Sequence, residues 1–481
     1  MKVNKLSLFY VLSFVEGGMM FTTELASTRK ISVFFGSSLY VWIIVLSITL
    51  VGLAVGYYWA NNRIEKNKLN KDYPDAKVLS KLFLYLSIAL LIWKFNNSIA
   101  LWLINSGFEL ITAVCVDALI LVAFPMFLFG AMTTYFVALG QKIQSNLPVY
   151  GKILAFSTFG SVVFAVISVL LFFPKIGVQN TILSFSVLSL LLSALLFKVK
   201  WWSVAVMVIG ILIPEKNIRV NVLYKNDGAF SNLMVVEQYK TRYLLVNYII
   251  QSFKDYANDK TLEYAELMDS VAKIQQWKNK DVLILGLGGG ILANVLEKYS
   301  RSITGIEIDP RIIDCAKKYF DLNPRVNAIC DDAQWWIQKD MNKYDVIIMD
   351  LFNGEEPPAY LLTKENFERI KNKLIKKDGI LIINWYGYYT GEIGRGTRIL
   401  LNTLSSAGFS VSALSTNLYQ DRSNLVIYAS LDKNTLPINK IEIQKEDEIN
   451  TADKNILSLL NADVNYQWRK GYLNFIQNWW N

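Results

Sequence analysis

Long apolar runs separated by short polar loops dominate residues 1–214 of the chain. A helix needs about 20 apolar residues to cross a bilayer, and all but the third and seventh runs come close to that length or exceed it. The pattern therefore predicts a membrane bundle of six or seven helices over residues 1–214. The runs fall at residues 6–27, 38–60, 79–93, 110–139, 153–173, 180–197 and 201–214.

From residue 215 the apolar positions follow a different pattern. Short strands within 219–248 and a helix at 261–276 predict a small β unit with a connecting helix over residues 215–277. Apolar strands of four to six residues then alternate with amphipathic helices. This alternation is typical of a doubly wound, largely parallel sheet, so we expect a Rossmann-like α/β domain over residues 278–432.

The remaining segment, residues 433–481, begins as a charged linker and ends in a helical pattern. One face of that helix collects the apolar residues Trp468, Tyr472, Phe475, Ile476 and Trp479. Two interpretations remain open: the face packs on the α/β domain, or it lies on the membrane surface as an amphipathic foot.

The positive charge of the chain is confined to its apolar half. Residues 1–214 hold 16 of the 49 Lys and Arg residues and 7 of the 40 Asp and Glu residues, which accounts for the whole net charge of +9. Basic residues in loops between apolar runs indicate membrane topology and argue against nucleic-acid binding. We therefore expect a multi-pass protein of the inner membrane, with the lipid bilayer as its partner and with a cytoplasmic N-terminus.

The run at 201–214 decides on which side the second half lies. Its 14 residues form a helix of about 21 Å, which is shorter than the hydrocarbon core of about 30 Å. We expect it to lie at the interface, which leaves the second half in the cytoplasm. If it spans the membrane instead, the second half is outside.

Three carboxylates, Glu16, Glu24 and Asp117, stand inside apolar runs. Intramembrane carboxylates are costly and are candidates for function. They either line a path for a cation or an amine, or pair within the bundle, for example with Arg29.

The chain contains no histidine. This excludes Ser-His-Asp hydrolysis, histidine general bases and metal sites built on imidazole, so no metal is expected. Three cysteines form neither a metal motif nor a disulfide framework. Any proton transfer must use carboxylates, Lys, Tyr or water.

Polar motifs follow four successive predicted strands of the α/β domain. Ligands bind at the carboxyl ends of strands in such sheets, so four motifs together are more specific than any one alone. The alternatives are a tight turn at the glycines, a helix cap at Asp309 or Asp350, and either a cap or a ligand at Asp331. The motifs are Gly286-Leu287-Gly288-Gly289-Gly290, Glu307-Ile308-Asp309, Asp331-Asp332, and Asp350-Leu351-Phe352-Asn353-Gly354-Glu355-Glu356.

This set resembles the spermidine synthase family, whose fold is similar to class I methyltransferases. It resembles more closely a membrane-fused branch, and Tyr150-Gly151-Lys152 to Gly160 and Phe129-Gly130-Ala131 resemble landmarks of its bundle. The resemblance implies transfer of an aminopropyl group from decarboxylated S-adenosylmethionine to a small-molecule amine such as putrescine. The resemblance is also compatible with a homo-oligomer.

The resemblance implies a role for each motif. Gln251 and Tyr264 would line the nucleotide and amine pocket, and Gly286, Gly288, Gly289 and Gly290 would face the sulfonium. Glu307 would hold the ribose, and Asp331-Asp332 would hold the adenine, with Asp332 as the contact. Asp350 would position the amine and accept its proton, while Glu355 and Glu356 attract the polycation. Asn353 stands where the soluble family has a second Asp.

Two other functions stay open at this point. One is a methyl or other transfer from intact S-adenosylmethionine. The other is a non-catalytic membrane protein that senses a nucleotide or takes part in transport, which the intramembrane carboxylates favour.

Overall fold

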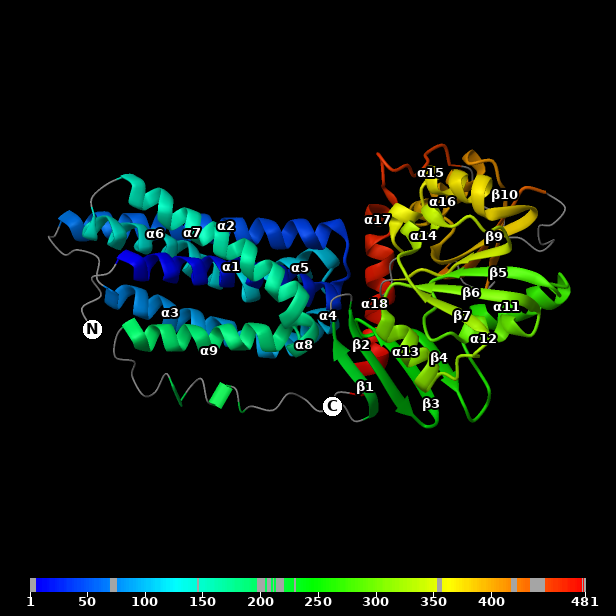
Figure 1. Ribbon diagram of the computed structural model, residues 1–481, viewed down its shortest axis with the longest axis horizontal. Coiled ribbons are helices and arrows are strands. Elements are labelled where there is room, and N and C mark those ends of the chain that lie inside the picture. Colours follow the sequence, from blue (N-terminus) through cyan, green and yellow to red (C-terminus); the bar gives the residue numbers. More distant parts are fainter. Residues whose placement is uncertain are drawn as a thin grey trace. The chain divides into compact units, whose positions relative to one another are not determined.

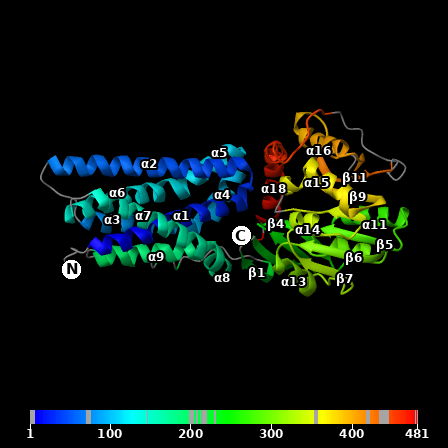
Figure 2. The ribbon, with the colours of Figure 1, turned by 45° about the horizontal axis from the view of Figure 1, so that its top comes forward.

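The structure is a computed structural model of residues 1–481. It forms two compact units. Unit 1 comprises Met1–Asn217, Asn226–Ser231 and Trp480–Asn481, and unit 2 comprises Ile218–Lys225 and Asn232–Trp479. Figures 1 and 2 show a helical bundle in the first and an α/β fold in the second. The residues described are 6–69, 76–144, 147–196, 204–205, 209–210, 212, 220–228, 231–352, 357–416, 422–432, 446–477 and 479.

Among the described residues of unit 1, six helical segments are long and apolar enough to cross a membrane. The predicted helical bundle is therefore confirmed as a fold. Of the predicted run at 201–214, only residues 204–205, 209–210 and 212 are among the described residues. The six segments are Leu6–Phe35, Leu39–Lys66, Lys77–Asn105, Leu110–Ile143, Pro148–Ile176 and Val178–Leu196.

Three of these segments change their helical geometry along their length. The third was predicted to end near residue 93, which is wrong: a 3₁₀ turn carries the helix past Lys94 to Asn105. Two others contain a π-helical turn. The elements are α1 (Leu6–Phe35), α2 (Leu39–Leu69), α3 (Ala76–Leu91), η1 (Ile92–Phe95), α4 (Asn96–Asn105), α5 (Leu110–Ala118), η2 (Leu119–Ala123), α6 (Phe124–Ile143), α7 (Leu147–Ile167), η3 (Ser168–Phe172), α8 (Phe173–Ile176) and α9 (Val178–Leu196).

Glycines allow the bundle helices to pack backbone against backbone. A Cβ at Gly160 of α7 would lie 1.9 Å from the carbonyl oxygen of Phe14 in α1, and a Cβ at Gly17 would lie 2.1 Å from that of Ser157. Helices in a membrane associate through such small residues, because lipid supplies no hydrophobic drive between them. The α1–α7 contact therefore depends on both glycines.

Unit 2 begins with a four-stranded sheet in the order β1-β2-β3-β4. The sequence predicted three strands here; the fourth was missed. Its turn is made by Asn247 and Tyr248, which both adopt left-handed φ angles (51° and 64°) without glycine. The strands are β1 (Asn221–Asp227), β2 (Asn232–Gln238), β3 (Thr241–Val246) and β4 (Ile249–Asp255).

The seven-stranded sheet that follows confirms the predicted doubly wound fold. Its order is β10-β11-β9-β8-β5-β6-β7; β5 to β9 run parallel, while β10 and β11 are antiparallel. The strands are β5 (Lys280–Leu285), β6 (Ser300–Glu307), β7 (Val326–Cys330), β8 (Tyr344–Met349), β9 (Ile375–Tyr388), β10 (Ser410–Ser415) and β11 (Arg422–Ser430).

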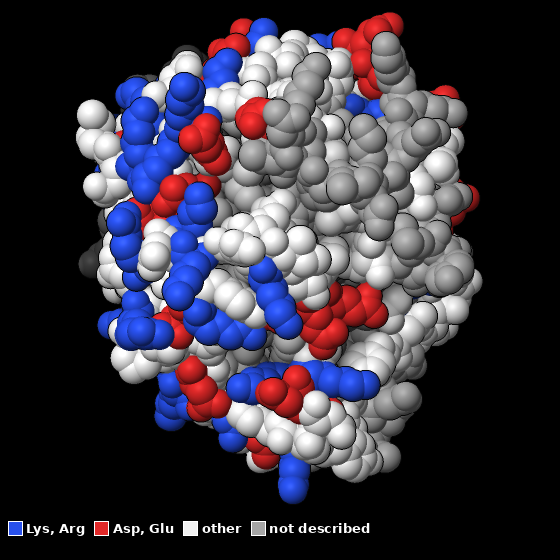
Figure 3. Space-filling view, turned by 90° about the vertical axis from the view of Figure 1, so that its right-hand side faces the viewer, with Lys and Arg blue, Asp and Glu red and all other residues white. Residues whose placement is uncertain are grey.

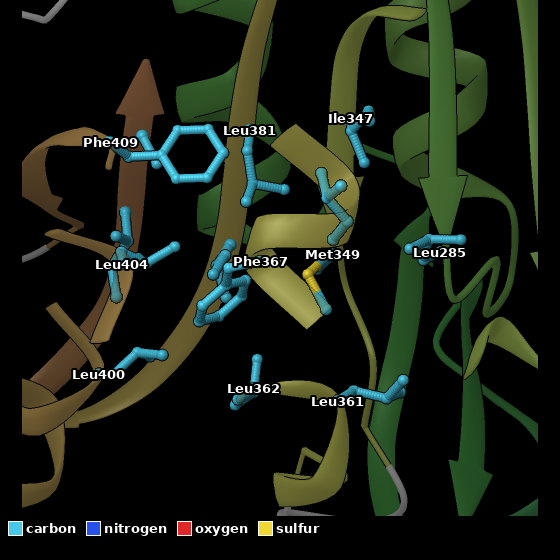
Figure 4. Close-up of a cluster of buried hydrophobic side chains, with 14 of the residues drawn as sticks. Leu285, Ile347, Met349, Leu361, Leu362, Phe367, Leu381, Leu400, Leu404 and Phe409 are labelled. Carbon is cyan, nitrogen blue, oxygen red and sulfur yellow. The ribbon is translucent and has the colours of Figure 1, made fainter. Parts of the chain in front are cut away.

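Helices cover both faces of this sheet because buried strands present side chains alternately to either side. They are α11 (Glu263–Ile274), α12 (Ile291–Glu297), α13 (Pro310–Tyr319), α14 (Ala333–Lys339), η4 (Ala359–Leu361), α15 (Lys364–Arg369), η5 (Ile370–Leu374), η6 (Glu392–Gly394) and α16 (Arg395–Ser406). Those from α11 to α13 share one core with β5 and β8, and those from α14 to α16 share the other. Figure 4 shows part of the second core, where Phe367 lies among Met349, Leu381 and Leu400.

The C-terminal helices are α17 (Leu457–Leu460) and α18 (Ala462–Gln477). Leu473, Ile476 and Trp479 are buried, whereas Phe475 is 52% exposed. α18 contacts β4 and β9, so the predicted apolar face packs on the α/β unit. Figure 3 shows one face of the molecule, on which basic and acidic side chains are interspersed, in keeping with the balanced charge of the second half.

We predict that Gly160→Ala destabilises the bundle, because the added Cβ cannot fit against Phe14 without separating α1 from α7. Overpacking of this kind costs about 1–3 kcal/mol. Thermal unfolding of the full chain in detergent would measure it. Gly151→Ala on the same helix is the control, since nothing lies within 4 Å of its Cβ position. Equal midpoints for the two variants would contradict the close packing.

Candidate active site

The glycine turn after β5 is tied to the start of the segment after β8. Gly286 has φ +92°, and a Cβ there would lie 2.1 Å from the carbonyl oxygen of Asp350. The amide of Asp350 in turn donates to the Leu285 carbonyl at 2.8 Å. Only glycine fits both the backbone angle and the close approach. The predicted tight turn and the predicted catalytic carboxylate therefore form one rigid junction.

The amides of the turn point to two acceptors. Gly289 donates to Ser252 Oγ of β4 at 2.9 Å, and Gly288 donates to Glu307 Oε2 at 3.2 Å. Gly290 (φ +74°) begins α12. The small sheet thus fixes the turn through Ser252, a residue that the sequence did not single out.

Glu307, at the end of β6, is buried. Its carboxylate accepts from the amides of Gly288 and Asp309, the latter at 3.1 Å. Burial raises its pKa to about 7, against the lowering effect of these backbone donors. A buried carboxylate held in this way can still accept from hydroxyl donors of a ligand, which fits the predicted ribose contact.

The neighbouring acidic residues have structural partners. Asp309 caps α13 by accepting from the amide of Arg311 at 3.0 Å, so the predicted cap is confirmed. Asp332 caps α14 by accepting from Trp335 at 2.9 Å. Asp331 pairs with Lys339, which lowers its pKa. The adenine contact of Asp331 and Asp332 stays a prediction.

Asp350 is held by two neutral donors from different elements. The hydroxyl of Tyr264, on α11, donates to Oδ2, and the Asn384 amide, on β9, donates to Oδ1 at 2.9 Å. Burial raises the pKa of Asp350, and the two donors act against that rise. Burial and the adjacent carboxylate raise the pKa of Tyr264 well above its usual value. Asp350 and Tyr264, which were predicted separately for the site, are therefore in direct contact.

Asn384 adds a feature that the sequence prediction missed. Among the described residues, its buried side-chain oxygen has no hydrogen-bond partner. Leu351, Pro357 and Leu361 surround a gap beside it that is too small for a water molecule in this structure. An orphaned acceptor next to a fixed carboxylate suits a donor that is bound only during function, such as an amine. The signal was present, because in the sequence Asn384 directly follows the apolar run Ile380-Leu381-Ile382-Ile383, although β9 continues beyond it.

The remaining predicted pocket residues fall into two groups. Gln251 lies on β4, next to Ser252, which contacts the glycine turn. Asn353, Glu355 and Glu356 lie outside the described residues.

The carboxylates within the apolar helices of unit 1 are a separate set. Glu16 is buried and accepts from the hydroxyls of Thr133 at 3.0 Å and Ser157 at 3.3 Å. Asp117 is buried and accepts from the Asn96 amide at 3.0 and 3.1 Å.

Glu24, by contrast, is half-buried. Arg29, named above as a possible partner for these carboxylates, forms an ion pair with Asp227 at 3.2 Å.

Comparison with known families agrees with this geometry. Residues 261–390, which include Tyr264, the glycine turn, Glu307, Asp350 and Asn384, match the Spermine/spermidine synthase domain. The α/β unit is spermidine synthase-like. The matched segment therefore contains the predicted nucleotide-binding and catalytic motifs of this synthase-like domain, apart from Gln251.

Three curated relatives illustrate the range of similar proteins. The chain is 37% identical to a polyamine aminopropyltransferase of Vibrio vulnificus over 116 residues, 23% of this chain and 38% of that protein. It is 29% identical to an N-terminal histidine N-methyltransferase of Emericella nidulans over 197 residues, 38% of this chain and 34% of that one. Polyamine aminopropyltransferase 2 of Aquifex aeolicus is 24% identical over 404 residues, 78% of each chain.

The first two of these similarities are local. The chain spans about a third of the length of each of the first curated relatives it matches. The Aquifex aeolicus match is longer than the second half of this chain, so it extends into the apolar half.

We predict that Glu307 destabilises the ligand-free domain as pH rises. Its folded pKa of about 7 exceeds the ordinary 4.5, so its contribution to stability is complete below pH 4.5 and is lost by about pH 7. The loss amounts to about 3 kcal/mol at most. Glu307→Gln should therefore gain stability over the unchanged protein at pH 8 but not at pH 4.5, measured by thermal unfolding. If the stability difference between Glu307→Gln and the unchanged protein is the same at both pH values, the raised pKa of Glu307 is contradicted.

Proposed function

We propose that this protein is a membrane-anchored aminopropyltransferase that uses decarboxylated S-adenosylmethionine and an amine such as putrescine. The observation that supports it most is the Asp350 carboxylate, fixed by Tyr264 and Asn384 beside the glycine turn. The six apolar helices support the anchor, and we place the synthase-like domain in the cytoplasm.

The strand order supports separate positions for the two substrates. The glycine turn follows β5, the middle one of the five parallel strands. Glu307 ends β6 on one side of it; on the other side Asp350 follows β8 and Asn384 lies on β9. The nucleotide would bind over β5 to β7, with its ribose hydroxyls on Glu307. The acceptor amine would approach from β8 and β9, so the reacting groups meet at the Gly286–Asp350 junction.

The reaction needs a free amine lone pair, and an alkylammonium with a pKa of about 10 is almost fully protonated at neutral pH. Asp350 would orient the ammonium and take its proton, directly or through water. The nitrogen then forms a bond to the aminopropyl carbon attached to sulfur. That carbon–sulfur bond breaks, its electron pair stays on sulfur, and a neutral thioether leaves.

Calorimetry on the full-length protein tests the reaction class. Decarboxylated and intact S-adenosylmethionine are titrated in parallel, putrescine is added to the tighter complex, and products are identified by mass spectrometry. An aminopropylated product supports the proposal. Preference for the intact form would point to methyl transfer, the activity named for the Emericella nidulans relative.

We predict that Asp350→Asn lowers turnover at least about 100-fold, because the amide keeps the shape but cannot take the proton. Nucleotide affinity should stay unchanged, since Glu307 and the glycine turn are untouched. Steady-state kinetics and calorimetry measure the two effects. Asp378→Asn, an exposed position on β9, is the control. Retained turnover in Asp350→Asn would refute its assignment.

A cation path through the bundle is the second candidate function. Burying an ionised carboxylate in an apolar bundle is costly unless a cation or a proton compensates it. Among the described residues, the hydrogen-bond partners of Glu16 and Asp117 are hydroxyls and an amide. A bound proton or another cation would therefore stabilise each carboxylate.

If the bundle carries a cation, Glu16→Gln and Asp117→Asn should each abolish uptake of labelled putrescine into proteoliposomes. The amides keep the size and shape of the carboxylates but cannot change charge. Glu109→Gln, an exposed position before α5, is the control. If putrescine uptake by all three variants equals that of the unchanged protein, the cation path is contradicted and the two carboxylates have a structural role only.

A further inference from the structure

The C-terminal helix α18 brings Trp468 into an aromatic cluster at the sheet edge that carries Asp350. Trp468 stacks on Tyr386 with ring centres 4.3 Å apart and planes inclined by 19°. Phe352 and Tyr472 meet it edge-on at 5.9 and 5.4 Å. We call these four residues the aromatic wall.

Two residues of the aromatic wall lie close in sequence to Asn384 and Asp350, the residues proposed to hold the acceptor amine. Tyr386 follows Asn384 by two positions on β9, so both side chains point to the same face of the strand. Phe352 follows Asp350 by two positions. The wall therefore belongs to the β8–β9 side and is separated by β5 from Glu307 at the end of β6.

The position of Trp468 is fixed by contacts elsewhere on its helix. Leu473 and Ile476 are buried, and Trp479 packs on Tyr243 of β3 at 5.3 Å. Arg469 donates to the carbonyl of Asn247 at 3.2 Å. Trp468 itself is only half-buried. Part of its ring thus stays available on a helix that is anchored on both sides.

We propose that the aromatic wall binds the acceptor amine, with Trp468 as its main contact. This inference rests on the proposed aminopropyl transfer. A diamine or polyamine alternates methylene segments with ammonium groups. Its methylenes need apolar surface, and its distal ammonium is attracted to the face of an aromatic ring. Asp350 and the Asn384 oxygen would hold the attacking nitrogen, and the wall would hold the rest.

The test separates acceptor binding from turnover. The full-length protein is saturated with methylthioadenosine, the thioether that the reaction would leave, and putrescine binding is measured by calorimetry. Trp468→Leu should weaken putrescine binding about tenfold, corresponding to 1.4 kcal/mol, and leave methylthioadenosine affinity unchanged. Trp468→Phe should restore most of the loss. Phe475→Leu, an exposed position on the same helix, is the control.

Kinetics distinguish a failure of this inference from a failure of the proposed reaction. Aminopropyl transfer by the unchanged protein with the same putrescine KM in Trp468→Leu would overturn the aromatic wall alone. A parallel loss of methylthioadenosine affinity would also overturn it, because Trp468 would then support the nucleotide or the fold. Weakened putrescine binding without any turnover would retain the wall and refute the transfer reaction.

Discussion

The close approach of Gly286 to the Asp350 backbone is the constraint on which the site depends. The two residues follow neighbouring parallel strands, and a side chain of any size at Gly286 would collide with the Asp350 carbonyl. The turn that would face the nucleotide therefore cannot move without the carboxylate that would receive the amine. Reactions between two bound substrates gain from such fixed geometry, because the reacting atoms are held at short range before the chemical step.

Neutral donors hold one functional candidate carboxylate in each unit, Asp350 and Glu16. Asp350 accepts from Tyr264 and Asn384, and Glu16 accepts from Thr133 and Ser157. A lysine or arginine partner would lower the pKa of Asp350 and make it a weaker base. With hydroxyl and amide partners, the burial that raises this pKa keeps much of its effect, which suits a group that must take a proton from an ammonium.

Much of the α/β fold and its site could be predicted because parallel strands place successive strand ends along one edge. That rule found Glu307 and Asp350 from the end of an apolar strand alone. It does not identify partners that come from other elements. The turn into β4, made by Asn247 and Tyr248, lacks the glycine that predicts such turns, so Ser252 was missed. In the bundle, Lys94 interrupts the apolar run but not the helix, because a 3₁₀ turn continues into α4.

In the proposed reaction, the division of the sheet would give acceptor specificity a separate structural basis from nucleotide binding. Glu307 and the glycine turn belong to strands and turns of the matched family segment, whereas Trp468 lies on a helix outside residues 261–390. Changes in α18 can therefore alter the wall without altering the backbone amides around Glu307. Because Asn384 holds Asp350 and shares its strand face with Tyr386, the distance between Asp350 and the aromatic wall is fixed by β9. The length of the acceptor amine would then be selected by the distance from Asp350 to α18. The nucleotide pocket would fix only the starting point of that distance.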